Sequence, residues 1–192
     1  MAGKGGVTVF NFRKRLFYPI HVERVDPVFA QQLVEHYGSK DGELASAVQY
    51  LSHRNNMHNR TVQELMGLLA AEELSHLEML AVVINKLGER PVGLANRAGI
   101  PWSVSFVDQS TNPVALLQAD IDMELRSNAI YGEYSKITQD MGLQRLFSFL
   151  AMREGIHKRL LQKTQILFQQ GGTSEQFSEL IYEYKMSLQV LD

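Results

Sequence analysis

Two stretches of the 192-residue chain decide its fold. The first is LMGLLAAEELSHLEMLAVVINKL at residues 65–87, and the second is LQRLFSFLAMREGIHKRLLQKTQILF at residues 143–168. Apolar side chains recur in both at the spacing of one face of a helix. Each stretch also carries a Glu-x-x-His element within that apolar stripe, Glu73 with His76 and Glu154 with His157. Because residues i and i+3 share a helix face, each pair is predicted to point inward and to grip one ion.

A glutamate precedes each motif at the same interval, Glu43 before Glu73 and Glu124 before Glu154. The turn within each pair lies midway, so the two glutamates are equally far from it. In an antiparallel helical hairpin, equal distance from the turn means equal height along the bundle. The two hairpins repeat at one interval, the separation of Glu73 from Glu154, and therefore bring four carboxylates and two imidazoles to one level. Ionised carboxylates in an apolar interior are unfavourable unless they are paired or bind metal, so the pattern predicts a shared pair of multivalent cations.

The rest of the pattern is that of an all-α protein. The expected helices cover residues 27–37, 41–54, 61–87, 113–138, 143–168 and 174–188. Residues 89–112 form a long connection without a helical period, so the arrangement predicted is a four-helix bundle with one long crossover and a short C-terminal helix. Residues 27–192 are expected to form the domain. Residues 1–26 are expected to form an extended arm that lies on its own bundle or on a neighbouring subunit.

Composition excludes several classes of protein. The chain has no cysteine, so it has no disulfide framework, thiolate zinc site or four-cysteine iron site. Its formal net charge is −2, so it has no basic excess with which to neutralise nucleic acid, and no nucleic-acid partner is expected. No apolar run approaches the roughly 18–20 residues that span a bilayer, and the N-terminus lacks the apolar centre of a signal peptide. We expect a cytoplasmic protein without a membrane partner.

Isolated polar residues of helices are usually exposed or internally satisfied. This is the expectation for the four remaining histidines, which are His21, His36, His53 and His58. Glu72, Glu78 and Glu133 are expected to be exposed acids or acids that touch a ligand side chain. Asp120 lies one helical turn before Glu124, so it either orients a ligand imidazole or is a solvated acid.

The sequence resembles the ferritin-like carboxylate-bridged dimetal proteins, and within them the manganese catalases. The resemblance rests on DPVFAQQLVEHYGSKDGELASAVQYLSHR at residues 26–54 and on the stretch at 65–87, in which GELxxA precedes AAEExxH. It covers roughly residues 15–170, and the short C-terminus is similar to that of the spore-coat members of the CotJC type. Some catalases have an arginine before the third glutamate ligand, where this chain has Met123.

The resemblance implies two manganese ions per chain and disproportionation of hydrogen peroxide to water and dioxygen. Glu73 would bridge the ions, with Glu43 and His76 on one ion and Glu124 and His157 on the other. Glu154 would be the catalytic acid/base rather than a direct ligand. The resemblance also implies a homo-oligomer, a hexamer, whose N-terminal arm crosses between subunits, and an association with other proteins of the spore coat.

Two other functions compete with the catalase. Carboxylates and imidazoles bind iron as well as manganese, so a ferroxidase or another di-iron oxidase or peroxidase has the same ligands. A rubrerythrin with its own four-cysteine iron site is excluded by the absence of cysteine. The remaining alternative is a mainly structural coat protein.

Overall fold

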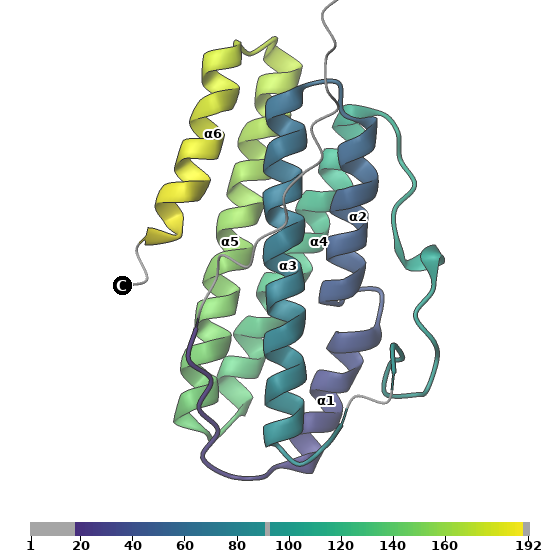
Figure 1. Cartoon of the computed structure of the whole chain (residues 1–192), viewed down its shortest axis with the longest axis vertical. Helices are drawn as coiled ribbons and strands as arrows, with labels where there is room; N and C mark the ends of the chain where they lie inside the picture. The colour runs from purple at the N-terminus through teal and green to yellow at the C-terminus, as the bar shows by residue number, and fades with distance from the viewer. Residues whose placement is uncertain (1–17, 91–92, 190–192) are drawn as a thin grey trace, which may run out of the picture.

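The computed structural model describes residues 18–90 and 93–189, and these residues confirm an all-α, four-helix bundle with one long crossover (Figure 1). The elements are α1 (Pro27–Gly38), α2 (Glu43–Asn56), α3 (Arg60–Lys86), the short 3-10 helix η1 (Val104–Phe106), α4 (Pro113–Ile137), α5 (Met141–Gln170) and α6 (Ser174–Ser187). No helix in the described residues is both long enough and apolar enough to span a membrane.

Two antiparallel hairpins, α2–α3 and α4–α5, form the bundle. Figure 1 shows the described part of the crossover that joins them, residues 88–90 and 93–112, which passes α1 and then α2 on the outside of the bundle before α4 begins. The short helix α6 packs against α3 and α5, and α1 packs against the far end of α3. Helix α6 therefore covers the side formed by α3 and α5, whereas α1 covers the C-terminal part of α3.

The helix ends follow the capping residues in the sequence. The Asp26 side chain accepts a hydrogen bond from the Phe29 amide at 3.0 Å and caps α1, as Asp26-Pro27 predicts. Gly88 follows α3 with φ of 100°, a conformation that glycine adopts without strain. The start of α5 was predicted slightly too late, because Asp140 caps the helix through the amides of Gly142 and Leu143.

A glycine brings α1 and α2 close together. Gly42 precedes the first residue of α2, Glu43, and a Cβ atom at Gly42 would lie 2.0 Å from the carbonyl oxygen of His36. Only glycine allows the chain to approach so closely. This turn therefore places the C-terminal end of α1 beside Glu43.

The apolar core is divided along the bundle into two clusters. Tyr50, Leu69, Leu117 and Leu161 belong to the first cluster, towards the end where α4 begins. Phe29, Leu33, Leu80 and Phe147 belong to the second, where α1 packs. The six buried side chains of Glu43, Glu73, His76, Glu124, Glu154 and His157 lie between the two clusters and form a polar layer there.

Residues 18–26 have no regular secondary structure and lie on their own bundle. Tyr18 stacks on Phe149 with ring centroids 4.4 Å apart, and Ile20 and Val22 pack against the second cluster. Most of the predicted arm, residues 1–17, lies outside the described residues.

Candidate metal centre

The structure brings all six predicted site residues together in the polar layer. Glu43 opens α2, Glu73 and His76 lie in the middle of α3, Glu124 lies in α4, and Glu154 and His157 lie in α5. Each of these side chains is at most 1% exposed. Positions within long helices fix the height of the other five groups, the turn at Gly42 fixes that of Glu43, and the two hairpins bring all six towards each other.

The donor atoms form two overlapping groups that share Glu73 and Glu154. One group adds Glu43 and His76, the other adds Glu124 and His157, and the ligand atoms within each group lie within 4.8 Å of one another. Nδ1 of His76 is 3.1 Å from Glu73 Oε2, and Nδ1 of His157 is 2.8 Å from Glu73 Oε1. The imidazole rings are nearly parallel, with centroids 5.9 Å apart.

Two buried tyrosines hold the carboxylates at the ends of this layer. Tyr50 donates a hydrogen bond to Oε1 of Glu124, and Tyr131 donates one to Oε1 of Glu43. Burial, followed by the charge of the adjacent glutamate, raises the pKa of both phenols well above the usual value, so both remain donors. Tyr50 follows Glu43 at the same interval at which Tyr131 follows Glu124, so the repeat that relates the hairpins could have predicted this pair.

A fifth buried glutamate, Glu72, lies on the far side of both imidazoles, away from the four site carboxylates. Its oxygens are 3.1 Å from Nε2 of His157 and 3.6 Å from Nε2 of His76. Nε and Nη2 of Arg153 donate to Glu72 at 2.6 and 3.1 Å, and the hydroxyl of Tyr184 on α6 donates to it at 2.9 Å. Glu72 thus touches both ligand imidazoles, one of the two roles that the sequence left open for it. A carboxylate in this position orients imidazole ligands and increases their basicity.

The other two acids, Glu78 and Glu133, are exposed, as are two of the four histidines, His21 and His58. His53 is buried and satisfied instead. His36 departs from the expectation, because it is buried while its ring nitrogens have no hydrogen-bond partner among the described residues.

Asp120 corrects one sequence prediction. Its side chain is completely buried, so it is not a solvated acid, and it does not orient a ligand imidazole. Its Oδ1 accepts from Nε2 of Gln49 at 2.9 Å and lies 2.9 Å from Nδ1 of His53. Nε2 of His53 in turn lies 3.1 Å from the carbonyl oxygen of Asp108, in the crossover. Asp120 therefore ties α2 and the crossover to α4.

Three of the site carboxylates, Glu43, Glu73 and Glu154, differ in their affinity for protons. Burial would raise the pKa of Glu43, but His36 and His76 beside it lower this pKa well below its usual value. Burial and the charge of Glu124 raise the pKa of Glu73 to about 7. Burial and the charges of Glu73 and Glu124 raise the pKa of Glu154 well above its usual value. Glu154 is thus suited to carrying a proton in this centre.

The imidazoles respond in the opposite sense to burial. Burial would lower the pKa of His76, but the carboxylates of Glu154 and Glu73 raise it well above its usual value. For His157 the carboxylates of Glu72 and Glu124 have the same effect on the pKa. Without metal, both rings therefore retain protons that an incoming cation would displace.

This donor set fits a pair of divalent cations. Ligand atoms without a hydrogen-bond partner among the described residues include Oε2 of Glu43 and Glu124, Oε1 of Glu73 and Glu154, and Nδ1 of His157. Such buried atoms are unfavourable unless an ion takes them as ligands. Carboxylate oxygens and imidazole nitrogens suit manganese and iron, whereas the absence of thiolates disfavours softer metals.

Comparison with known families identifies the family of the chain. The sequence model of the family "Manganese containing catalase" matches residues 9–95 and 91–170. The chain belongs to this family. The resemblance seen in the sequence is therefore confirmed over most of the chain.

Two relatives and one more distant structure extend this comparison. CotJC of Bacillus subtilis is 32% identical over 177 residues, which cover 81% of this chain and 93% of CotJC. The crystal structure of KatB, a manganese catalase from Anabaena PCC7120, has a TM-score of 0.76 at 26% identity and covers 87% of this chain and 83% of KatB. A bacterioferritin of Desulfovibrio desulfuricans has a TM-score of 0.61 at 19% identity, over 80% of this chain and 89% of that protein, and confirms the ferritin-like fold.

Proposed function

We propose that the chain holds two manganese ions between its hairpins and there converts two molecules of hydrogen peroxide into two of water and one of dioxygen. The chain belongs to the manganese catalase family, which supports this activity. The observation that carries the proposal is the pair of buried donor groups that share Glu73 and Glu154. A shared carboxylate between two such groups is what a bridged pair of ions requires.

In the proposed centre, Glu43 and His76 would hold one ion, Glu124 and His157 would hold the other, and Glu73 would be shared by both. Bound manganese supplies the exchange of two electrons between successive peroxide molecules. The protein keeps bulk water out, since every one of these side chains is at most 1% exposed. Tyr50 and Tyr131 orient the outer carboxylates through their hydrogen bonds.

Glu154 is the proposed acid/base. Cleavage of the O–O bond needs protons delivered to the oxygens that become water, and dioxygen release needs protons removed from the second peroxide. The raised pKa of Glu154, caused by burial and by Glu73 and Glu124, supports this proton-carrying role. Its Oε1 lies 3.0 Å from Nδ1 of His76, within the layer of ligands.

We further propose that the protein is a cytoplasmic homo-oligomer, a hexamer, that joins other proteins in the spore coat. The similarity to CotJC supports the coat association. Three apolar side chains of the crossover support the assembly, because Leu94, Ile100 and Val104 are 50%, 54% and 68% exposed in the single chain. Contact with another subunit would bury them.

Metal analysis combined with oxygen evolution tests the function. We expect native protein to hold two manganese ions per chain and to release dioxygen from peroxide, and Glu73→Ala to lose both properties. Glu78→Ala, at an exposed glutamate of the same helix, is the matched control and should retain both. Iron uptake without dioxygen release would favour a ferroxidase instead. A folded, metal-free and inert native protein would favour a mainly structural role in the coat.

A further inference from the structure

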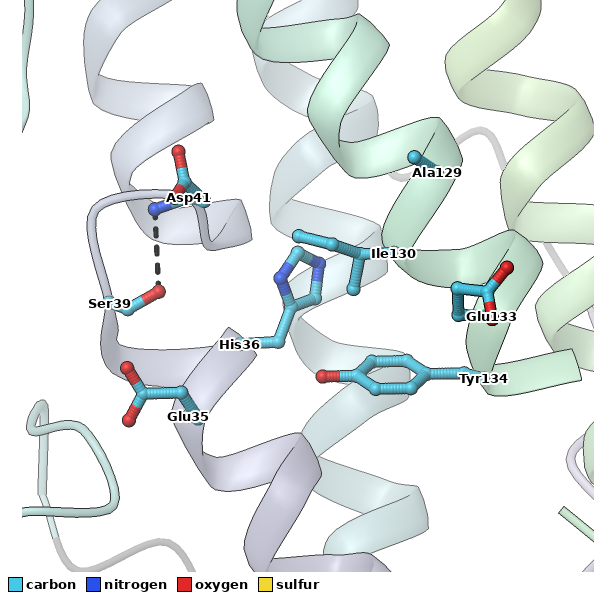
Figure 2. Close-up of a pocket in the computed structure, with 8 residues that line it drawn as sticks. All are labelled: Glu35, His36, Ser39, Asp41, Ala129, Ile130, Glu133 and Tyr134. Atoms are coloured by element: carbon cyan, nitrogen blue, oxygen red, sulfur yellow. Dashed lines mark hydrogen bonds between the residues drawn. The ribbon is translucent and has the colours of Figure 1, made fainter. Parts of the chain in front are cut away.

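A pocket of about 390 Å³ opens on the bundle surface close to the metal centre. It lies between the end of α1, the turn into α2 and the second half of α4, and it is lined by Glu35, His36, Ser39, Asp41, Ala129, Ile130, Glu133 and Tyr134 (Figure 2). Figure 2 shows the imidazole of His36 extending from α1 towards α4, beside Ile130 and Tyr134.

His36 separates this pocket from the metal centre. Its side chain lines the pocket, yet the residue is only 3% exposed. On the inner side, Nε2 lies 3.5 Å from Oε1 of Glu43, one of the six residues of the centre. The ring is held by an edge-on contact with Tyr131, whose centroid is 5.0 Å away. A single imidazole thus stands between solvent and a carboxylate of the centre.

The polar atoms of this imidazole have no hydrogen-bond partner among the described residues, although Nε2 faces the carboxylate of Glu43. Neither Nδ1 nor Nε2 of His36 makes a hydrogen bond in the described structure. A neutral imidazole offers one donor and one acceptor. A small molecule that both donates and accepts hydrogen bonds, as hydrogen peroxide does, can pair with either nitrogen, whereas an apolar gas can pair with neither.

Two other sides of the centre are closed by satisfied polar groups. On the side of α6, Glu72 is bonded to Arg153 and Tyr184. On the side of the crossover, Asp120 is bonded to Gln49 and lies against His53. Moving either cluster aside would break buried hydrogen bonds. Turning the ring of His36 would break no hydrogen bond of the described residues, but it would give up the 3.5 Å approach to Glu43 and the edge-on contacts with Tyr131 and Tyr134.

We infer that hydrogen peroxide reaches the metal centre through this pocket, and that His36 binds it and passes it inward. The inference rests on the proposed function, since it names the route of that substrate. A change in the side-chain conformation of His36 opens the route without movement of the helices.

Narrowing the pocket tests the route. Ala129 lines it and is exposed on α4, so Ala129→Trp adds bulk without touching the ligands. We expect kcat/KM for peroxide to fall at least fivefold, with kcat and the manganese content unchanged. The rate at which azide alters the EPR spectrum of the manganese-loaded protein should fall in parallel, and this readout does not depend on turnover. Met152→Trp, at an exposed position of α5 outside the pocket, should leave both rates as in the native protein.

Variants of His36 test its own part. His36→Leu removes the polar atoms and should lower kcat/KM about tenfold, with two manganese ions still bound. His36→Gln restores a donor and an acceptor, so its kcat/KM should be close to that of the native protein. If Ala129→Trp has the kcat/KM and the azide-binding rate of the native protein, the proposed route is wrong. If His36→Leu has the kcat/KM of the native protein, the proposed role of the imidazole is wrong. Native protein that releases no dioxygen would instead refute the proposed function, and the azide measurement would still decide the route.

Discussion

The two hairpins of the bundle match at the metal centre and differ around it. At the interval that separates Glu73 from Glu154, the residues Glu43, Tyr50, Glu73 and His76 of α2–α3 correspond to Glu124, Tyr131, Glu154 and His157 of α4–α5. The residue before each Glu-x-x-His motif breaks this match, because it is Glu72 in one hairpin and Arg153 in the other. These two side chains, related by the repeat, form a buried ion pair with each other.

The matched and unmatched residues have different roles, metal binding for the former and access to the centre for the latter. The matched residues supply an approximately symmetric set of donors, as a pair of similar ions requires. The unmatched residues make the surroundings of the centre unequal, so that the face below α6 is closed by Glu72 and Arg153 while the face beside α1 ends in a pocket. A symmetric site in asymmetric surroundings can bind two ions and still admit substrate from one side.

The largest effect is expected from removing one half of the unmatched pair. Glu72→Gln leaves the guanidinium of Arg153 buried without its carboxylate, which costs about 3–5 kcal/mol. For a chain of this size, the melting temperature of the metal-free protein should fall by about 10 °C. The same change should weaken manganese binding roughly 10–100-fold, because both imidazoles lose the carboxylate that orients them. Calorimetry and metal titration measure the two losses.

The double variant Glu72→Gln with Arg153→Gln separates these effects. It removes both charges, so most of the melting temperature should return, whereas the weakened metal binding should persist. If the double variant is no more stable than Glu72→Gln alone, the pair does not act through compensation of buried charge.

The matched tyrosines provide a second, smaller test. Tyr50→Phe and Tyr131→Phe each remove one hydrogen bond to a carboxylate of the centre. We expect each to weaken manganese binding about tenfold, at the lower limit for partners of metal ligands. Because the repeat relates the two phenols, the two losses should agree within about threefold in a metal titration. A loss confined to one variant would show that the two ends of the centre are not equivalent.

Much of the fold follows from the sequence. Asp26-Pro27, Gly88 and the two long apolar stripes locate the helices, and the equal spacing of Glu43 and Glu124 from their turns indicates that the six site residues share one level. The repeat of the two hairpins also contains the tyrosine pair and the pair of Glu72 and Arg153. These contacts could have been predicted by comparing every position of one hairpin with its equivalent in the other.

The surroundings of the centre do not follow from the sequence in this way. Burial of His36 depends on how closely α1 approaches α2 at Gly42, which is a tertiary contact and not a helical period. The sequence places Asp120 one helical turn from Glu124 and so near the ligand imidazoles, but its partner is His53 on α2. Helix periodicity determines on which face of its helix a side chain lies. The partner of that side chain depends on which other helix packs against that face.

The His53 network gives the smallest expected effect, at a position that the repeat does not match. Burial would lower the pKa of His53, but the hydrogen bond to Asp120 and the charge of that carboxylate raise it. A raised pKa means that the charged pair stabilises the fold below the unfolded pKa of about 6.5, and that this contribution is lost as the pH rises through the folded pKa. Against His53→Gln, the native protein should therefore be more stable at pH 6 by on the order of 1 kcal/mol, and the difference should shrink towards pH 9. Thermal unfolding across this range measures it, with His58→Gln, at an exposed histidine, as the control. If the stability difference between the two proteins grows with pH instead, the neutral form of His53 is the form that stabilises the fold.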